Sequence, residues 1–144
     1  PARYLLSGIA QLPFLGTMQL IPSNSTDSEL QYRDAEKRKE CDEDPHTIGG
    51  NLRVASASSC VEMAAMAQEQ FATIEVPFLV MIADEDAVVK NQGSLDLMEK
   101  SPSKDKTMKQ YPALHGLLCE PKPLVDQIQK DMLEWLDARA SPTS

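Results

Sequence analysis

The sequence predicts an α/β fold with parallel strands, and three neighbouring segments carry that prediction. A continuous apolar run over 78–83 has the length of a strand and no alternation of polar and apolar residues. Such a run is typical of a strand that is covered on both faces in a parallel sheet. An amphipathic helix over 94–100 and a second strand over 106–111 follow it. Strand, helix and strand together form the crossover unit of parallel sheets.

Composition indicates an ordinary globular protein of one domain's size, with 144 residues, 42% hydrophobic and 25% charged. The net charge of −8 argues against nucleic acid as a partner. No stretch approaches the ~20 apolar residues that a membrane helix needs. Cys41, Cys60 and Cys119 lack metal-ligand spacing, so we expect free thiols in a reducing cytoplasmic compartment. Nothing in the pattern indicates a metal or a cofactor.

The first half of the chain is predicted to be helical on either side of a polar segment. Residues 1–22 are apolar at three- and four-residue steps, which predicts a helix interrupted at Pro13. These residues alone leave open whether the helix packs on a sheet or offers an apolar surface to an acyl chain or a lipid. Segment 23–45 is expected to be a solvated face or loop. A long helix follows, from Asn51 as capping residue to about Gln70.

The chain closes with an amphipathic helix over 121–139, expected to pack on the sheet. Its apolar positions fall along one face, at Val125, Ile128, Met132, Trp135 and Leu136. We expect this helix to be a structural element.

Two residues with catalytic chemistry follow the two predicted strands. Asp86 comes just after the first strand, and His115 lies in the loop after the second. Because the strands are predicted to be parallel, their carboxyl ends lie at the same edge of the sheet, so the two side chains are expected to meet there. A carboxylate in that place binds one imidazole nitrogen and leaves the other as a base.

The segments around these residues resemble the C-terminal part of α/β-hydrolases, within them the monoacylglycerol lipase and lysophospholipase group. The motifs are Val76-Pro-Phe-Leu-Val, Asp86-x-Val-Val and His115-Gly-Leu-Leu-x-Glu-Pro. By this resemblance Asp86 is the acid and His115 the base of a Ser-His-Asp triad. The resemblance also implies a helical cap and return helix over 1–73, the C-terminal part of the hydrolase core over 74–140, and a tail over 141–144.

The triad serine of that family stands in Gly-x-Ser-x-Gly, and this motif is absent from the 144 residues. We therefore expect a fragment that is inactive by itself and depends on a missing N-terminal half of the same chain. The resemblance implies that the parent is a serine ester hydrolase, acting on a small-molecule acyl ester such as a monoacylglycerol or a lysophospholipid. It also allows peripheral membrane contact through the apolar cap.

Two alternatives stay open. One is a non-catalytic binding protein that kept the fold, since Met81-Ile82 stands where the family often carries His-Gly and the loop before His115 is short. The other is a peptidase or small-ester hydrolase on the same scaffold, because the composition of the cap discriminates poorly between substrates.

Overall fold

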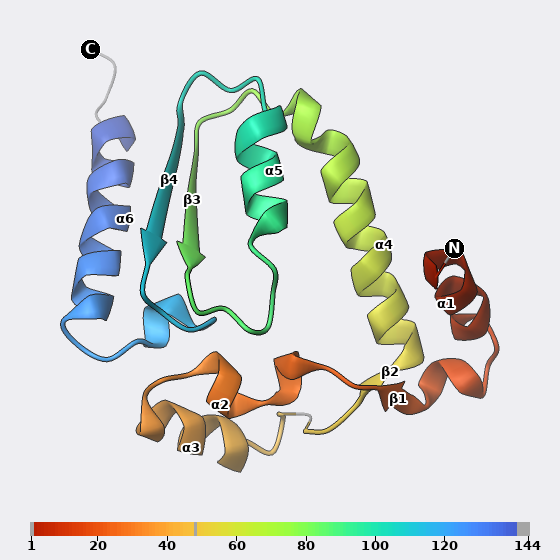
Figure 1. The fold of residues 1–144 in the computed structure, drawn as a ribbon. Helices are drawn as coiled ribbons and strands as arrows, with labels where there is room; N and C mark the ends of the chain where they lie inside the picture. The colour runs from red at the N-terminus through yellow and green to blue at the C-terminus, as the bar shows by residue number, and fades with distance from the viewer. Residues whose placement is uncertain (1, 48, 141–144) are drawn as a thin grey trace.

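The computed structural model describes residues 2–47 and 49–140, and its central element is a pair of parallel strands (Figure 1). Strand β3 (Phe78–Ala83) pairs with β4 (Lys106–Tyr111) in one continuous register, from Phe78 opposite Lys106 to Ala83 opposite Tyr111. Helix α5 (Gln92–Lys100) is the crossover between them. Both strands have the predicted bounds, and the helix begins two residues earlier than predicted. The predicted parallel unit is therefore confirmed.

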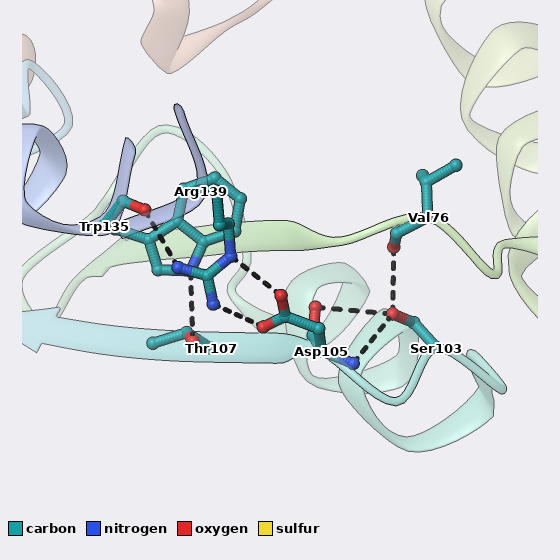
Figure 2. A network of polar contacts seen from close by, with 6 residues as sticks. All are labelled: Val76, Ser103, Asp105, Thr107, Trp135 and Arg139. Atoms are coloured by element: carbon teal, nitrogen blue, oxygen red, sulfur yellow. Dashed lines mark hydrogen bonds and ion pairs between the residues drawn. The ribbon is translucent and has the colours of Figure 1, made fainter. Parts of the chain in front are cut away.

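Buried serines connect the amino ends of the two strands. Ser101 Oγ donates to the carbonyl of Ile74 at 2.6 Å, and Ser103 Oγ donates to that of Val76 at 2.9 Å. Figure 2 shows Ser103 between Val76 and the backbone of Asp105, just before β4 begins. The hydroxyls thus satisfy backbone carbonyls at the start of β3 that would otherwise lack a donor.

Helix α6 (Leu124–Ala140) packs on β4 through an apolar centre and a polar end. Ile128 is 1% exposed and clusters with Ala83, Tyr111 and Ala113. The polar end is drawn in Figure 2: the Trp135 indole N–H donates to Thr107, and Arg139 binds the Asp105 carboxylate. The guanidinium of Arg139 also lies 3.9 Å from the centroid of the Trp135 ring, a cation–π contact. As predicted, the helix covers the sheet.

The N-terminal part is a helical layer joined by a short antiparallel ladder. Its elements are α1 (Ala2–Ala10), η1 (Leu15–Thr17), β1 (Gln19–Ile21), β2 (Leu52–Arg53), α4 (Val54–Gln70) and η3 (Phe71–Thr73). Two predictions were wrong here. Helix α1 ends at Ala10, three residues before Pro13, and α4 begins at Val54 rather than Asn51, because residues 52 and 53 pair with β1 instead.

The polar segment between these helices contains helical turns rather than loop alone: η2 (Asn24–Thr26), α2 (Ser28–Gln31) and α3 (Ala35–Glu43). Helix α3 begins because the Asp34 carboxylate accepts the N–H groups of Glu36 and Lys37. None of its residues is buried, so the prediction of a solvated face is confirmed for this helix. In Figure 1, α2 and α3 lie across the end toward which β3 and β4 point.

No helix of residues 2–47 and 49–140 is both long and apolar enough to cross a membrane. The division into cap and core at residue 73 stays a prediction, and the predicted tail at 141–144 lies outside the described residues.

Candidate active site

Asp86 and His115 meet beyond the carboxyl ends of the two parallel strands. His115 Nδ1 lies 2.9 Å from Asp86 Oδ2. The Asp86 side chain is 9% exposed and the His115 side chain 37% exposed. A carboxylate at Nδ1 fixes the tautomer that carries the proton there, so Nε2 is the nitrogen that can take a proton from another group.

The two loops approach because the hydrogen-bond ladder continues past the strands. The N–H of Asp84 donates to the carbonyl of Tyr111 at 2.9 Å, and the N–H of Glu85 donates to that of Ala113 at 3.1 Å. Ala113 is fully buried. The acid-bearing and histidine-bearing loops therefore leave the sheet already paired, which places Asp86 opposite His115.

Local hydrogen bonds hold the Asp86 carboxylate in the turn after β3. Its Oδ1 accepts the N–H groups of Val88 at 2.9 Å and Val89 at 2.8 Å. Asn91 closes the turn by donating from Nδ2 to the carbonyl of Ala83 at 2.7 Å. Both carboxylate oxygens are thus occupied, one by the turn and the other by the imidazole.

The electrostatics of this turn favour the ionised carboxylate. Burial pushes the pKa of Asp86 up, but the hydrogen bonds from His115, Val89 and Val88 outweigh burial and bring the pKa below its ordinary value. An ionised Asp86 at neutral pH can orient the imidazole and stabilise its cation.

The imidazole of His115 borders an apolar hollow of about 490 Å³. Its lining includes Met81 from β3, Leu117 from the short helix η4 (Leu117–Cys119), and Ile128 and Met132 from α6. The site can therefore move a proton beside an apolar surface. Among the described residues, 2–47 and 49–140, no serine hydroxyl is hydrogen-bonded to His115.

Sequence reasoning missed a group of charged residues around the pair. Arg33, from the polar segment, binds both Glu85 and Glu120, which lie on the two loops of the site. The charges around Arg33 indicated a solvated face, and no local pattern marks a contact made across such a distance in the chain. The second histidine, His46, lies in an exposed turn, where its backbone N–H donates to Asp44.

Parallel strands with an acid after the first and a histidine after the second define the α/β-hydrolase class. The family model described as "Serine aminopeptidase, S33" (Hydrolase_4) matches residues 4–122, and the chain belongs to this α/β-hydrolase family. The predicted resemblance is thereby confirmed. The roles of Asp86 and His115 in a triad stay predictions.

Similar proteins include esterases and lipases. Caffeoylshikimate esterase of Arabidopsis thaliana is 29% identical over 137 residues, which are 94% of this chain and 40% of that protein. Monoacylglycerol lipase of Mycolicibacterium smegmatis is 26% identical over 117 residues, 81% of this chain and 41% of that protein. The chain thus spans about two fifths of these curated relatives.

The fold is confirmed by a solved structure. The crystal structure of Paleococcus ferrophilus monoacylglycerol lipase superimposes with a TM-score of 0.79 at 22% identity, over 96% of this chain and 52% of that one. The predicted fold, part of an α/β-hydrolase, is therefore the observed one.

Proposed function

We propose that this chain supplies the acid and the base of a serine hydrolase that cleaves carboxylic esters of lipid-like acyl groups, such as monoacylglycerols or lysophospholipids. The observation that carries the proposal is the 2.9 Å contact between Asp86 and His115 at the ends of two parallel strands. The names of the similar proteins, an esterase and monoacylglycerol lipases, support ester substrates.

In the proposed mechanism, His115 Nε2 takes the proton of a serine hydroxyl as the oxygen attacks the ester carbonyl. The same nitrogen then gives the proton to the leaving alcohol, and Asp86 stabilises the imidazolium between these steps. The serine would come from residues outside this chain, since the 144 residues contain no Gly-x-Ser-x-Gly. Backbone donors beside that serine would stabilise the oxyanion by about 3 kcal/mol each.

Exposed apolar side chains on the N-terminal helices support a lipid-like substrate and a peripheral membrane contact. They include Leu5 on α1, Phe14 beside η1, and Met63 and Met66 on α4. Covering them with an acyl chain would gain about 0.8 kcal/mol per buried methylene. We propose that these side chains also make the peripheral membrane contact.

The test is kinetic, with monoacylglycerol as substrate and the full-length protein as enzyme. Asp86→Asn is expected to lower kcat by about 10⁴-fold, because the amide favours the wrong imidazole tautomer. His115→Ala is expected to lower kcat by about 10⁶-fold, because members of a triad act as a unit. His46→Ala, in an exposed turn, is the matched control and should leave kcat unchanged. Unaltered hydrolysis by Asp86→Asn would refute the assignment.

Peptide-bond hydrolysis at an amino terminus is the second candidate, favoured by the description of the matching family as a serine aminopeptidase. Paired substrates with the same chromophore separate the two: a p-nitrophenyl ester and an amino-acid p-nitroanilide. A larger kcat/KM for the anilide would assign the peptidase. A full-length sequence without the serine would instead establish a non-catalytic binding protein.

A further inference from the structure

The residues next to Asp86 and next to His115 are held by one segment of the polar region, residues 24–33, which we call the clasp. On the acid side, Asn24 Nδ2 donates to the carbonyl of Ala87 at 2.7 Å. On the histidine side, the N–H of Gly116 donates to the carbonyl of Gln31 at 2.8 Å. The clasp therefore contacts the residue that follows the acid and the residue that follows the base.

Arg33 also connects to the residues that precede Asp86 and His115, directly on the acid side and through Glu120 on the histidine side. Its Nη2 lies 3.0 Å from Glu85 Oε1, directly before Asp86, and its Nε lies 3.0 Å from Glu120 Oε2. Glu120 Oε1 in turn accepts the N–H of Leu114, directly before His115, at 2.6 Å. The guanidinium of Arg33 therefore holds each loop at the residue before Asp86 or His115, whereas Asn24 and Gln31 hold it at the residue after.

Glu120 is the member of this network that most needs its partner. Its side chain is 1% exposed, whereas that of Glu85 is 52% exposed. A buried carboxylate is stable only when charged or hydrogen-bonding groups compensate for lost hydration. Arg33 supplies the positive charge, and its planar fork lets one side chain bind two carboxylates in different directions.

Tyr32 adds a close packing contact between the clasp and the histidine loop. A Cβ added to Gly116 would lie 2.7 Å from Tyr32 Cδ1, so the glycine is needed for the clasp to approach the histidine loop this closely. Four hydrogen-bonded or ionic links and one tight packing contact thus converge on the two loops.

We propose that Arg33 is a positioning residue: by linking Glu85 to Glu120, it holds the acid and histidine loops in the register that keeps Asp86 on His115 Nδ1. The proposal rests on the proposed function for its catalytic consequence, but not for its geometry. Within the described residues, no group of the polar segment is hydrogen-bonded to the imidazole of His115. According to the proposal, the segment nevertheless influences the rate of proton transfer by positioning that imidazole.

The experiment compares Arg33→Met with Arg38→Met. Arg38 lies on α3, and its replacement removes the same charge from the same polar region without breaking a side-chain contact of the site. Two readouts are taken on the full-length protein. Proton NMR follows the downfield Nδ1 proton of His115, assigned by its loss in His115→Asn. Kinetics with a short-chain p-nitrophenyl ester gives kcat and KM separately.

Arg33→Met is expected to weaken or abolish the Nδ1 proton signal and to lower kcat by about 10–100-fold, with KM changed less than about threefold, because misplacement of a catalytic group by 1 Å costs about that much. Arg33→Lys should recover only part of kcat, since an ammonium lacks the fork that reaches both carboxylates. Arg38→Met should behave as wild type in both readouts.

Two outcomes would overturn the proposal: an unchanged Nδ1 proton in folded Arg33→Met, or equal effects of Arg33→Met and Arg38→Met. If Arg33→Met fails to fold, Glu85→Gln removes the exposed one of the two carboxylates that Arg33 links and is judged by the same signal. If the unaltered protein cleaves no ester, the proposed function fails, and the NMR comparison still decides whether the clasp positions His115.

Discussion

The two halves of the described chain are held together in different ways. In residues 74–140, α6 and the two strands enclose an apolar cluster centred on Ile128, which is 1% exposed. Among residues 4–47 and 49–73, the buried apolar side chains are Val54 and Ala57 at the start of α4, whereas Phe14 is 75% exposed and Met66 is 65% exposed. The second half therefore has an apolar core around Ile128, whereas few apolar side chains are buried among the described residues of the first half.

The difference shows that similar apolar residues serve two purposes in this fold. At the carboxyl ends of β3 and β4 they are buried, at Ile82, Ala83 and Tyr111, and supply stability. On α1 and α4 they remain on the surface, where they are available to a ligand or to another part of the protein. The polar segment between α1 and α4 reaches the site through hydrogen bonds, the two ion pairs of Arg33 and the packing of Tyr32 against Gly116.

The largest effect should come from truncating the centre of the second half. Ile128→Ala removes a fully buried side chain, and we expect a loss of about 2–5 kcal/mol in the free energy of unfolding. Met66→Ala, an apolar truncation on the exposed face of α4, should change it by less than about 0.5 kcal/mol. Urea unfolding measures both. Equal losses would show that the first half has a core of its own.

The next effect concerns the polar link between β4 and α6. The Tyr111 hydroxyl donates to Asp131 Oδ2 at 2.8 Å. Burial first, and then this bond, raise the pKa of Tyr111, so the hydroxyl stays a donor over the usual pH range. Tyr111→Phe should lower the free energy of unfolding by about 1.5–3 kcal/mol, because the acceptor is charged. If Tyr111→Phe lowers the free energy of unfolding no more than Met66→Ala does, the bond between Tyr111 and Asp131 does not stabilise the second half.

A third variant tests where the two halves touch. Gly116→Ala would place a Cβ 2.7 Å from Tyr32 Cδ1, and we expect a loss of about 1–3 kcal/mol in the free energy of unfolding from overpacking. The control is Gly93→Ala in α5, where an added Cβ meets no atom within 4 Å and alanine favours the helix by about 0.5–1 kcal/mol. The midpoint temperature of thermal unfolding should therefore fall for Gly116→Ala and rise for Gly93→Ala. An increase in the midpoint temperature for both variants would mean that the Tyr32 side chain can move aside to accommodate the added methyl group.

The strands and the acid–histidine pair were predictable because each depends on local pattern and chain order. The apolar run over 78–83 and the segment over 106–111 have the bounds of β3 and β4. Once two strands are parallel, their following loops share an edge, which is why Asp86 and His115 could be placed together across 29 residues.

The clasp and the short ladder were not predictable, since neither leaves a local signal. Arg33 and Glu120 are 87 residues apart, and a charge in a polar segment is the same in sequence whether it faces water or a buried carboxylate. Likewise Gln19 pairs with Arg53 only in the folded chain, and this pairing displaced the start of α4 from the capping residue Asn51.

The smallest effect should be a pH dependence that arises from one carboxylate of the second half. The folded-state pKa of Asp86 lies below its unfolded value of about 3.9, so the ionised side chain stabilises the fold above about pH 4, and this stabilisation disappears as the pH falls through the folded pKa. The difference in free energy of unfolding between wild type and Asp86→Asn should therefore shrink between about pH 5 and pH 3. Urea titrations across that range measure it. A constant difference would mean that ionisation of Asp86 adds nothing to stability, so that the turn, with its Val88 and Val89 N–H donors, holds the protonated carboxyl as well as it holds the carboxylate.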